Sequence, residues 1–231
     1  MNPTRRVFFR SSFLVIWAVA MTTVTVVLGA PPLRILRLVM GRLLFFAIAL
    51  GLSLVLFGVG WKPLAILFLL LTALVGVYSE LLDRKWHPIS SAAIAVSLSC
   101  IFGILGFGLW TLRVGKSWYA QALEYLKATL GGLSFFKTEM GFAVEDLLMQ
   151  APSGLVVLLL LASAVLLIME PRLREWAGTS GREMNTSYLR GFRLPDVFVW
   201  VTILSLLGSF VKSDIKWIQV VSVNLLNVCV L

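Results

Sequence analysis

The polar residues that could bind a ligand inside the apolar parts of this sequence are few and neutral. Asn224 and Asn227 are three residues apart near the end of the chain, and Gln219 precedes Asn224 by about one turn. Residues three apart share a face of a helix. Such a face can hydrogen-bond a neighbouring helix, or it can line a pocket for a small molecule. The spacing is compatible with both roles.

Residue patterns of catalytic and metal sites are missing from the sequence. The one histidine, His87, follows Arg84 and Lys85, and there is no phosphate-binding lysine loop, HExxH, GxSxG or CxxC motif. Cys100 and Cys229 lie within apolar runs, where we expect them to act as small packing residues. We therefore predict no enzymatic activity, no cofactor and no metal.

The composition predicts an all-α, polytopic transmembrane helix bundle that forms one domain. Of 231 residues, 59% are hydrophobic and 13% charged, and the mean hydropathy is +0.95. A soluble protein of this length needs a polar shell that such a composition cannot supply. The net charge of +9 is spread over loops, so we expect it to set membrane topology and not to bind nucleic acid.

Seven clear apolar segments are visible, and proline or glycine marks most of their junctions. They cover residues 11–29, 43–60, 63–79, 88–111, 153–169, 197–211 and 216–231. With a cytoplasmic N-terminus, seven spans would leave ten Lys and Arg residues on each side of the membrane, a tie that the positive-inside rule disfavours. A short extra crossing by residues 29–41 would give 13 inside and 7 outside. We therefore predict about eight crossings.

The extra crossing requires special surroundings. Residues 29–41 reach only about 20 Å as a helix, less than the roughly 30 Å hydrocarbon core, so protein or a water-filled cavity must surround them. We expect Pro31 and Pro32 to start this short helix, and Arg34 and Arg37 to share one face at i, i+3. The alternative is an amphipathic helix that lies on the outer surface.

Two polar segments connect the later spans. The outer segment, 112–151, predicts an amphipathic helix with Trp118 and Tyr119 in the aromatic belt, followed by a short helix that Pro152 ends. This segment either rests on the headgroups or caps an outward-facing cavity. The inner segment, 170–195, holds five arginines and, counted together with the adjoining Asp196, four acidic residues. We expect solvated charges there, and docking of a cytoplasmic partner is the alternative.

Small residues recur every four positions at Ala95, Ser99 and Gly103. Such a stripe allows helices to approach closely, either inside the bundle or against a partner protein.

The segment YLRGFRLPDVFVWVTIL, residues 188–204, and the final VNLLNVCVL resemble the YybS-like family of bacterial polytopic membrane proteins. The early layout agrees with that family in its proline-bearing short segment, its Gly41–Arg42 turn and the sequence LLDRKW. The resemblance covers most of the chain. Its best-matched residues are Phe192, Arg193, Leu194, Pro195 and Asn224.

That family is similar in architecture to the S components of energy-coupling-factor transporters. The resemblance implies a bacterial cytoplasmic membrane protein that binds a small molecule from outside and depends on a separate transmembrane coupling protein with ATPases. The resemblance implies further membrane sequence after the position of Leu231. We therefore expect either a truncated chain or a last helix that ends abruptly, and a pocket completed by later residues would then be missing. The ligand-binding candidates are Trp110, Trp118, Tyr119, Asp214, Gln219, Asn224 and Asn227.

The alternative function is a non-transporting membrane scaffold or assembly factor. Its partner-facing candidates are Ala95, Ser99, Gly103, Arg190 and Arg193.

Overall fold

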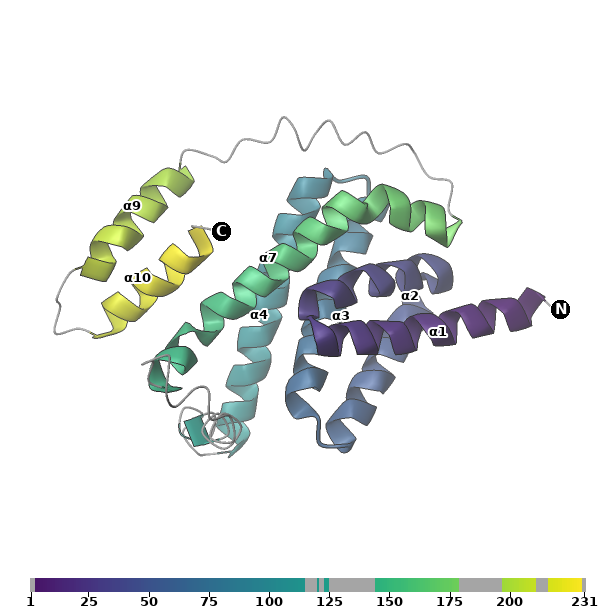
Figure 1. Ribbon diagram of the computed structural model, residues 1–231, viewed down its shortest axis with the longest axis horizontal. Helices are drawn as coiled ribbons and strands as arrows, with labels where there is room; N and C mark the ends of the chain where they lie inside the picture. The colour runs from purple at the N-terminus through teal and green to yellow at the C-terminus, as the bar shows by residue number, and fades with distance from the viewer. Residues whose placement is uncertain are drawn as a thin grey trace. The chain divides into compact units, whose positions relative to one another are not determined.

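The computed structural model is all-helical throughout the part of the chain that it describes, which is residues 3–114, 120, 123–124, 144–178, 197–210 and 216–229 (Figure 1). The seven helices in these residues are α1 (Pro3–Val24), α2 (Val26–Gly58), α3 (Lys62–Asp83), α4 (Pro88–Val114), α7 (Val144–Ala177), α9 (Val197–Phe210) and α10 (Lys216–Cys229). The predicted all-α class is confirmed.

Four segments of the described helices are long and apolar enough to cross a membrane: Val26–Gly58, Lys62–Asp83, Pro88–Gly106 and Gln150–Ala177. These four helices identify the chain as a helical membrane protein. The apolar parts of α1, α9 and α10 are shorter. The last two helices have 14 residues each and reach about 21 Å, so length and composition do not identify them as spans.

The chain divides into two compact units, which are described separately. Unit 1 consists of Met1–Gly103 and Leu158–Phe192, and unit 2 of Ile104–Val157 and Arg193–Leu231. Helices α4 and α7 contribute residues to both units.

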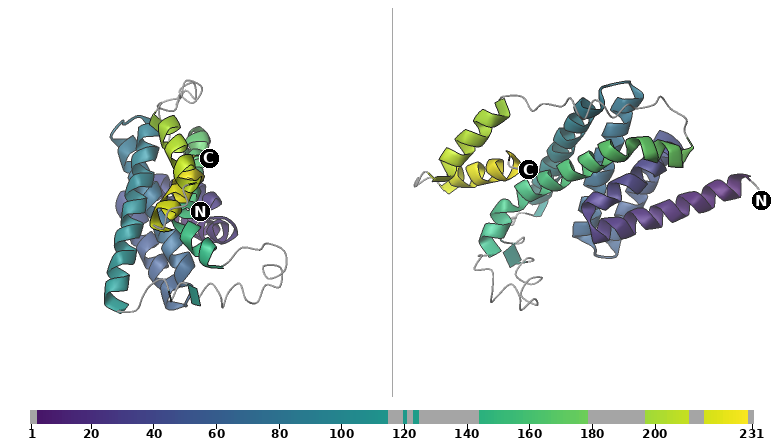
Figure 2. Two further views of the ribbon diagram at one scale, coloured as in Figure 1. Left: turned by 90° about the vertical axis from the view of Figure 1, so that its left-hand side faces the viewer. Right: turned by 45° about the horizontal axis from the view of Figure 1, so that its top comes forward.

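Unit 1 begins with a helical hairpin. Helix α1 ends at Val24, and Thr25 has an extended backbone with its side chain accepting the Leu28 N–H at 3.3 Å, as an N-cap does. The first half of α2 then folds back along α1 (Figures 1 and 2). This close approach depends on Gly29, since a Cβ there would collide with the Thr22 hydroxyl and lie 2.8 Å from Leu71 Cδ2.

The short helical element expected around residues 29–41 is present with different bounds. It starts at Val26, so the prediction that Pro31 and Pro32 start it is wrong; both lie inside the helix. It ends where Gly41 adopts φ 77°, ψ −177°, a conformation that glycine tolerates. Residues 26–40 span about 22 Å, and every residue from 29 to 37 is buried. Protein surrounds the element, as a short membrane segment requires.

Helix α3 has 22 residues, about 33 Å, and similar turns precede and follow it. Before it, Gly60 has φ 94° and donates to Phe57 O, while Trp61 donates to Leu56 O. After it, Lys85 has φ 64° and donates to Leu82 O, while Trp86 donates to Leu81 O. Both are Schellman motifs. Each presents an exposed tryptophan, which places one at either end of α3, as expected for membrane interfaces.

Apolar side chains fill the interior of unit 1. The ring of Phe46 packs on Gly76, where a Cβ would come within 2.6 Å of it. Leu70 packs on Gly103 in the same way, at 3.3 Å. Many leucines and phenylalanines outside this core are exposed, which suits contact with lipid. The core includes Leu33, Leu36, Phe45, Phe68, Leu71, Leu74, Tyr78, Ala95, Leu159, Ala162 and Leu166.

Helix α7 corrects two predicted boundaries. The helix expected to end at Pro152 continues through that residue, and the span expected to end at 169 continues through Pro171 to Ala177. The predicted inner segment 170–195 therefore begins as helix. In a membrane, neighbouring polar groups can satisfy the backbone that a proline disturbs, so proline marks a helix end less reliably than in water.

Candidate functional site

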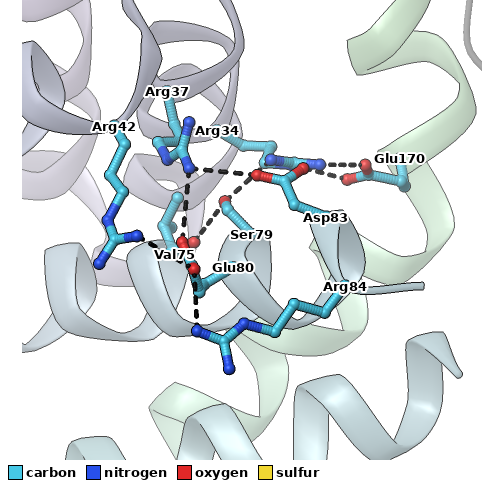
Figure 3. A network of polar contacts seen from close by, with 9 residues as sticks. All are labelled: Arg34, Arg37, Arg42, Val75, Ser79, Glu80, Asp83, Arg84 and Glu170. Atoms are coloured by element: carbon cyan, nitrogen blue, oxygen red, sulfur yellow. Dashed lines mark hydrogen bonds and ion pairs between the residues drawn. The ribbon is translucent and has the colours of Figure 1, made fainter. Parts of the chain in front are cut away.

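A buried ion pair joins three helices of unit 1. Arg34, from the first half of α2, has a side chain that is 1% exposed, and Glu170 of α7 is 0% exposed. Arg34 donates through Nε and a terminal nitrogen to the two carboxylate oxygens, with Nε 3.0 Å from Oε2. Its other terminal nitrogen donates to Ser79 Oγ of α3 at 2.8 Å (Figure 3). We call Arg34 and Glu170 the core pair.

Two further contacts complete the core pair. Arg174, one turn beyond Glu170, donates from Nε to Oε1 of the same carboxylate at 2.8 Å. The Arg34 guanidinium also lies 5.8 Å from the centre of the Tyr78 ring, a distance suited to a cation–π interaction. A buried charge without its partner is very costly. The core pair therefore holds α2, α3 and α7 in one arrangement.

A second charged group, the rim cluster, lies beside the core pair and is more exposed. It consists of Arg37, Arg42, Glu80, Asp83 and Arg84. Arg37 is 3.1 Å from Asp83 Oδ2 and 3.8 Å from Glu80 Oε2. Arg42 and Arg84 each donate to Glu80 Oε1 at 3.2 Å. Their side chains are 61% and 65% exposed, so these two pairs contribute little to stability.

The core pair was not predicted from the sequence. Glu170 was expected among the solvated charges of the inner segment, and for this residue the expectation is wrong, because it is fully buried. An arginine in an apolar segment does signal that an acidic partner exists. Glu80, Asp83 and Glu170 were all available, and only the fold selects among them.

A neutral polar group, the amide cluster, joins α7 and α10 within unit 2. Asn224 Oδ1 accepts the backbone N–H of Ser153 at 3.1 Å, and its Nδ2 donates to Val220 O at 2.8 Å. Asn227 Nδ2 lies 3.4 Å from Ser153 Oγ. The two asparagines therefore share a face, and they form hydrogen bonds between helices. Ser153 directly follows Pro152, so Asn224 supports the turn of α7 that the proline disturbs.

A groove opens beside the amide cluster. Its volume is about 330 Å³, at the lower end of the range for small-molecule sites, roughly 300–1,000 Å³. The wall combines apolar surface with uncharged hydrogen-bonding groups. It is formed by Gln150, Ala151, Ser153, Gly154, Val157 and Asn227.

The structure describes the side chains of few predicted site residues. Of the ligand-binding candidates, Asn227 lines the groove, and Asn224 supports it through Ser153. Trp110 and Gln219 lie in α4 and α10, with side chains outside the described part. Wholly outside the described residues are Trp118, Tyr119, Arg190, Arg193 and Asp214. Ser153, Gln150 and Gly154 were missed, since serine and glycine in an apolar helix also occur for packing alone.

The small-residue stripe lies inside unit 1. Ala95 and Ser99 are 0% exposed, and Gly103 packs against Leu70. The chain's own helices already cover these residues, which favours their packing role over contact with a partner.

No family model, no curated protein and no solved structure matches this chain. The resemblance to the YybS-like family therefore stays a prediction.

Proposed function

We propose that the chain is a small-molecule-binding membrane protein of the kind that serves as the substrate-binding component of a multi-subunit importer. The groove beside the amide cluster carries this proposal. It joins the carboxamides of Gln150 and Asn227 and the hydroxyl of Ser153 to an apolar wall, a combination typical of small-molecule sites. The YybS-like resemblance and its likeness to S components agree with this role.

The proposal includes a topology in which the N-terminus and the arginine-bearing end of unit 1 share the cytoplasmic side. The burial of residues 29–37 and their return along α1 support a short crossing, since a helix on the outer surface would expose one face. Residues 26–40, 42–58, α1, α3, α4 and α7 then make six crossings. The N-terminal part of α7, with the groove, faces outward.

Helices α9 and α10 have 14 residues each, too few for a complete crossing as a helix, so the proposal leaves them unassigned. It therefore assigns six of the about eight predicted crossings.

Cysteine labelling tests the topology. With Cys100 and Cys229 replaced by alanine, single cysteines would be introduced as Asn2→Cys, Lys85→Cys and Gln150→Cys. In intact cells, a membrane-impermeant maleimide should label the variant at 150 and reach positions 2 and 85 only after permeabilisation. Labelling of position 85 from outside would contradict the short crossing.

A groove-filling variant tests the function. An added Cβ at Gly154 or at Gly51 would meet no atom within 4 Å, so Gly154→Phe fills the groove, and Gly51→Phe is a matched control in the apolar second half of α2. Each purified protein would be extracted and its small molecules identified by mass spectrometry. We expect one compound with the wild type and the control, and its loss from Gly154→Phe.

The scaffold alternative predicts the opposite result. A scaffold would yield no small molecule from any variant, together with a partner protein that co-purifies equally with Gly154→Phe. That result would overturn the proposed function.

A further inference from the structure

The rim cluster brings three guanidinium groups to one carboxylate. Arg37 and Arg42 from α2 and Arg84 from the end of α3 all pair with Glu80 (Figure 3). Asp83 is the second acidic member and pairs with Arg37. Three cations therefore face two anions, and the exposed Lys85 beside them adds a further positive charge. The acidic residues position the arginines but do not neutralise them.

The two exposed arginines have donors to spare. A guanidinium carries five N–H groups in a planar fork that suits phosphate oxygens. In the described part of the chain, Arg42 donates through one nitrogen and Arg84 through one, both to Glu80 Oε1. Glu80 thus holds the two side chains close together, with their other N–H groups directed elsewhere. Two clamped guanidiniums fit one phosphate group better than scattered surface lysines do.

The position of the cluster suits a lipid headgroup. Arg42 directly precedes the apolar second half of α2, and Arg84 directly follows α3, so both lie where a span meets the surface. Trp86, two residues after Arg84, is exposed, as residues of the interfacial aromatic belt are. Anionic lipids attract arginines at this depth by about 1 kcal/mol per residue.

We infer that Arg42 and Arg84 form a binding site for the phosphate of an anionic phospholipid. Glu80 fixes the distance between the two guanidiniums, and the apolar flanks of α2 and α3 contact the acyl chains. This inference does not depend on the proposed function, because its residues belong to unit 1 and the groove belongs to unit 2.

Lipid binding to the purified full-length chain tests the inference. Native mass spectrometry would compare retention of phosphatidylglycerol and phosphatidylcholine by the wild type, by Arg42→Gln/Arg84→Gln and by Lys62→Gln. Lys62 is exposed at the opposite end of α3 and serves as the matched control. We expect the wild type and the control to prefer phosphatidylglycerol, and this preference to fall about fivefold for each arginine removed.

Three outcomes would overturn the inference: equal retention of both lipids by the wild type, an equal loss in the Lys62→Gln control, or displacement of the lipid by millimolar inorganic phosphate. The last would identify free phosphate as the ligand. Should the double variant not fold, the wild type still provides the test. Phosphatidylglycerol should raise its melting temperature more than phosphatidylcholine does, and an equal effect would contradict the site.

Discussion

The core pair and the amide cluster both attach α7 to other helices, yet they differ in charge and burial. Arg34 and Glu170 form an ion pair enclosed by protein. Asn224 and Asn227 are neutral, and Asn227 lies exposed at a groove. In the core pair, each charged group has been removed from water, and only the opposite charge of its partner offsets that free-energy cost. In the amide cluster, water or a ligand can replace a missing partner.

This difference in replaceability indicates separate roles. A contact that tolerates exchange of partners can serve binding, whereas a contact that tolerates none serves to fix the fold. Helix α7 carries both, with Ser153 and Glu170 well separated along it. Substitutions in each contact should therefore change the free energy of unfolding by different amounts.

The largest effect is expected for Glu170→Gln. It leaves the buried Arg34 guanidinium without a compensating charge, which should lower the free energy of unfolding by about 3–5 kcal/mol. Denaturation in mixed micelles, followed by tryptophan fluorescence, would measure it. The control Glu80→Gln alters a partly exposed carboxylate and should cost less than about 1 kcal/mol.

A double variant separates lost pairing from lost packing. Arg34→Met/Glu170→Met removes both charges and keeps most of the volume, so it should recover most of the stability that Glu170→Gln loses. A double variant as unstable as the single one would show that the charges themselves are needed.

The second largest effect concerns the hairpin that delivers Arg34 to Glu170. Gly29→Ala forces a Cβ against Thr22 and Leu71, and such overpacking costs about 1–3 kcal/mol. Gly51→Ala is the matched control, since nothing lies within 4 Å of its added Cβ. Alanine's helix propensity should make that variant equal to or more stable than the wild type. Equal loss in both variants would argue against the tight hairpin.

The sequence predicts the elements of unit 1 better than their junctions. The apolar segments predicted at 63–79 and 88–111 lie within α3 and α4. Arg34 and Arg37 were predicted to share one face of a helix, and both form hydrogen bonds with residues of α3. The start of the short helix was misplaced because Thr25, which caps it, is a weaker signal than two adjacent prolines. Capping depends on local hydrogen bonding, which composition does not reveal.

The sequence did not predict which residues the polar side chains contact. The spacing of Asn224 and Asn227 indicated a polar face, but it could not identify Ser153, more than 70 residues away, as the contact. The same holds for Arg34 and Glu170, which are 136 residues apart. Tertiary packing determines both contacts, because it brings residues of α7 against α10 in one case and against α2 in the other.

A smaller effect is expected in the amide cluster. Asn224→Leu removes the carboxamide that bonds Ser153 N–H and should cost about 0.6 kcal/mol, at most about 1.7. Asn227→Leu should cost less still, because its contact with Ser153 is long, at 3.4 Å, and only partly buried. The same denaturation assay would measure both. A loss at Asn224 as large as that of Glu170→Gln would break the distinction between the two contacts.

Effects of about the same size concern the turns at the two ends of α3, and these should have opposite signs. Lys85 adopts the left-handed conformation that Gly60 adopts at the other turn, but its side chain makes that conformation costly. Lys85→Gly should therefore raise the free energy of unfolding by about 0.5–1 kcal/mol, the relieved strain outweighing the greater freedom of the unfolded chain. Gly60→Ala should lower it by about 1 kcal/mol. A loss of stability in both variants would contradict the prediction that backbone strain distinguishes the two turns. The lost charge of Lys85 beside the rim cluster would then have to explain the result for Lys85→Gly.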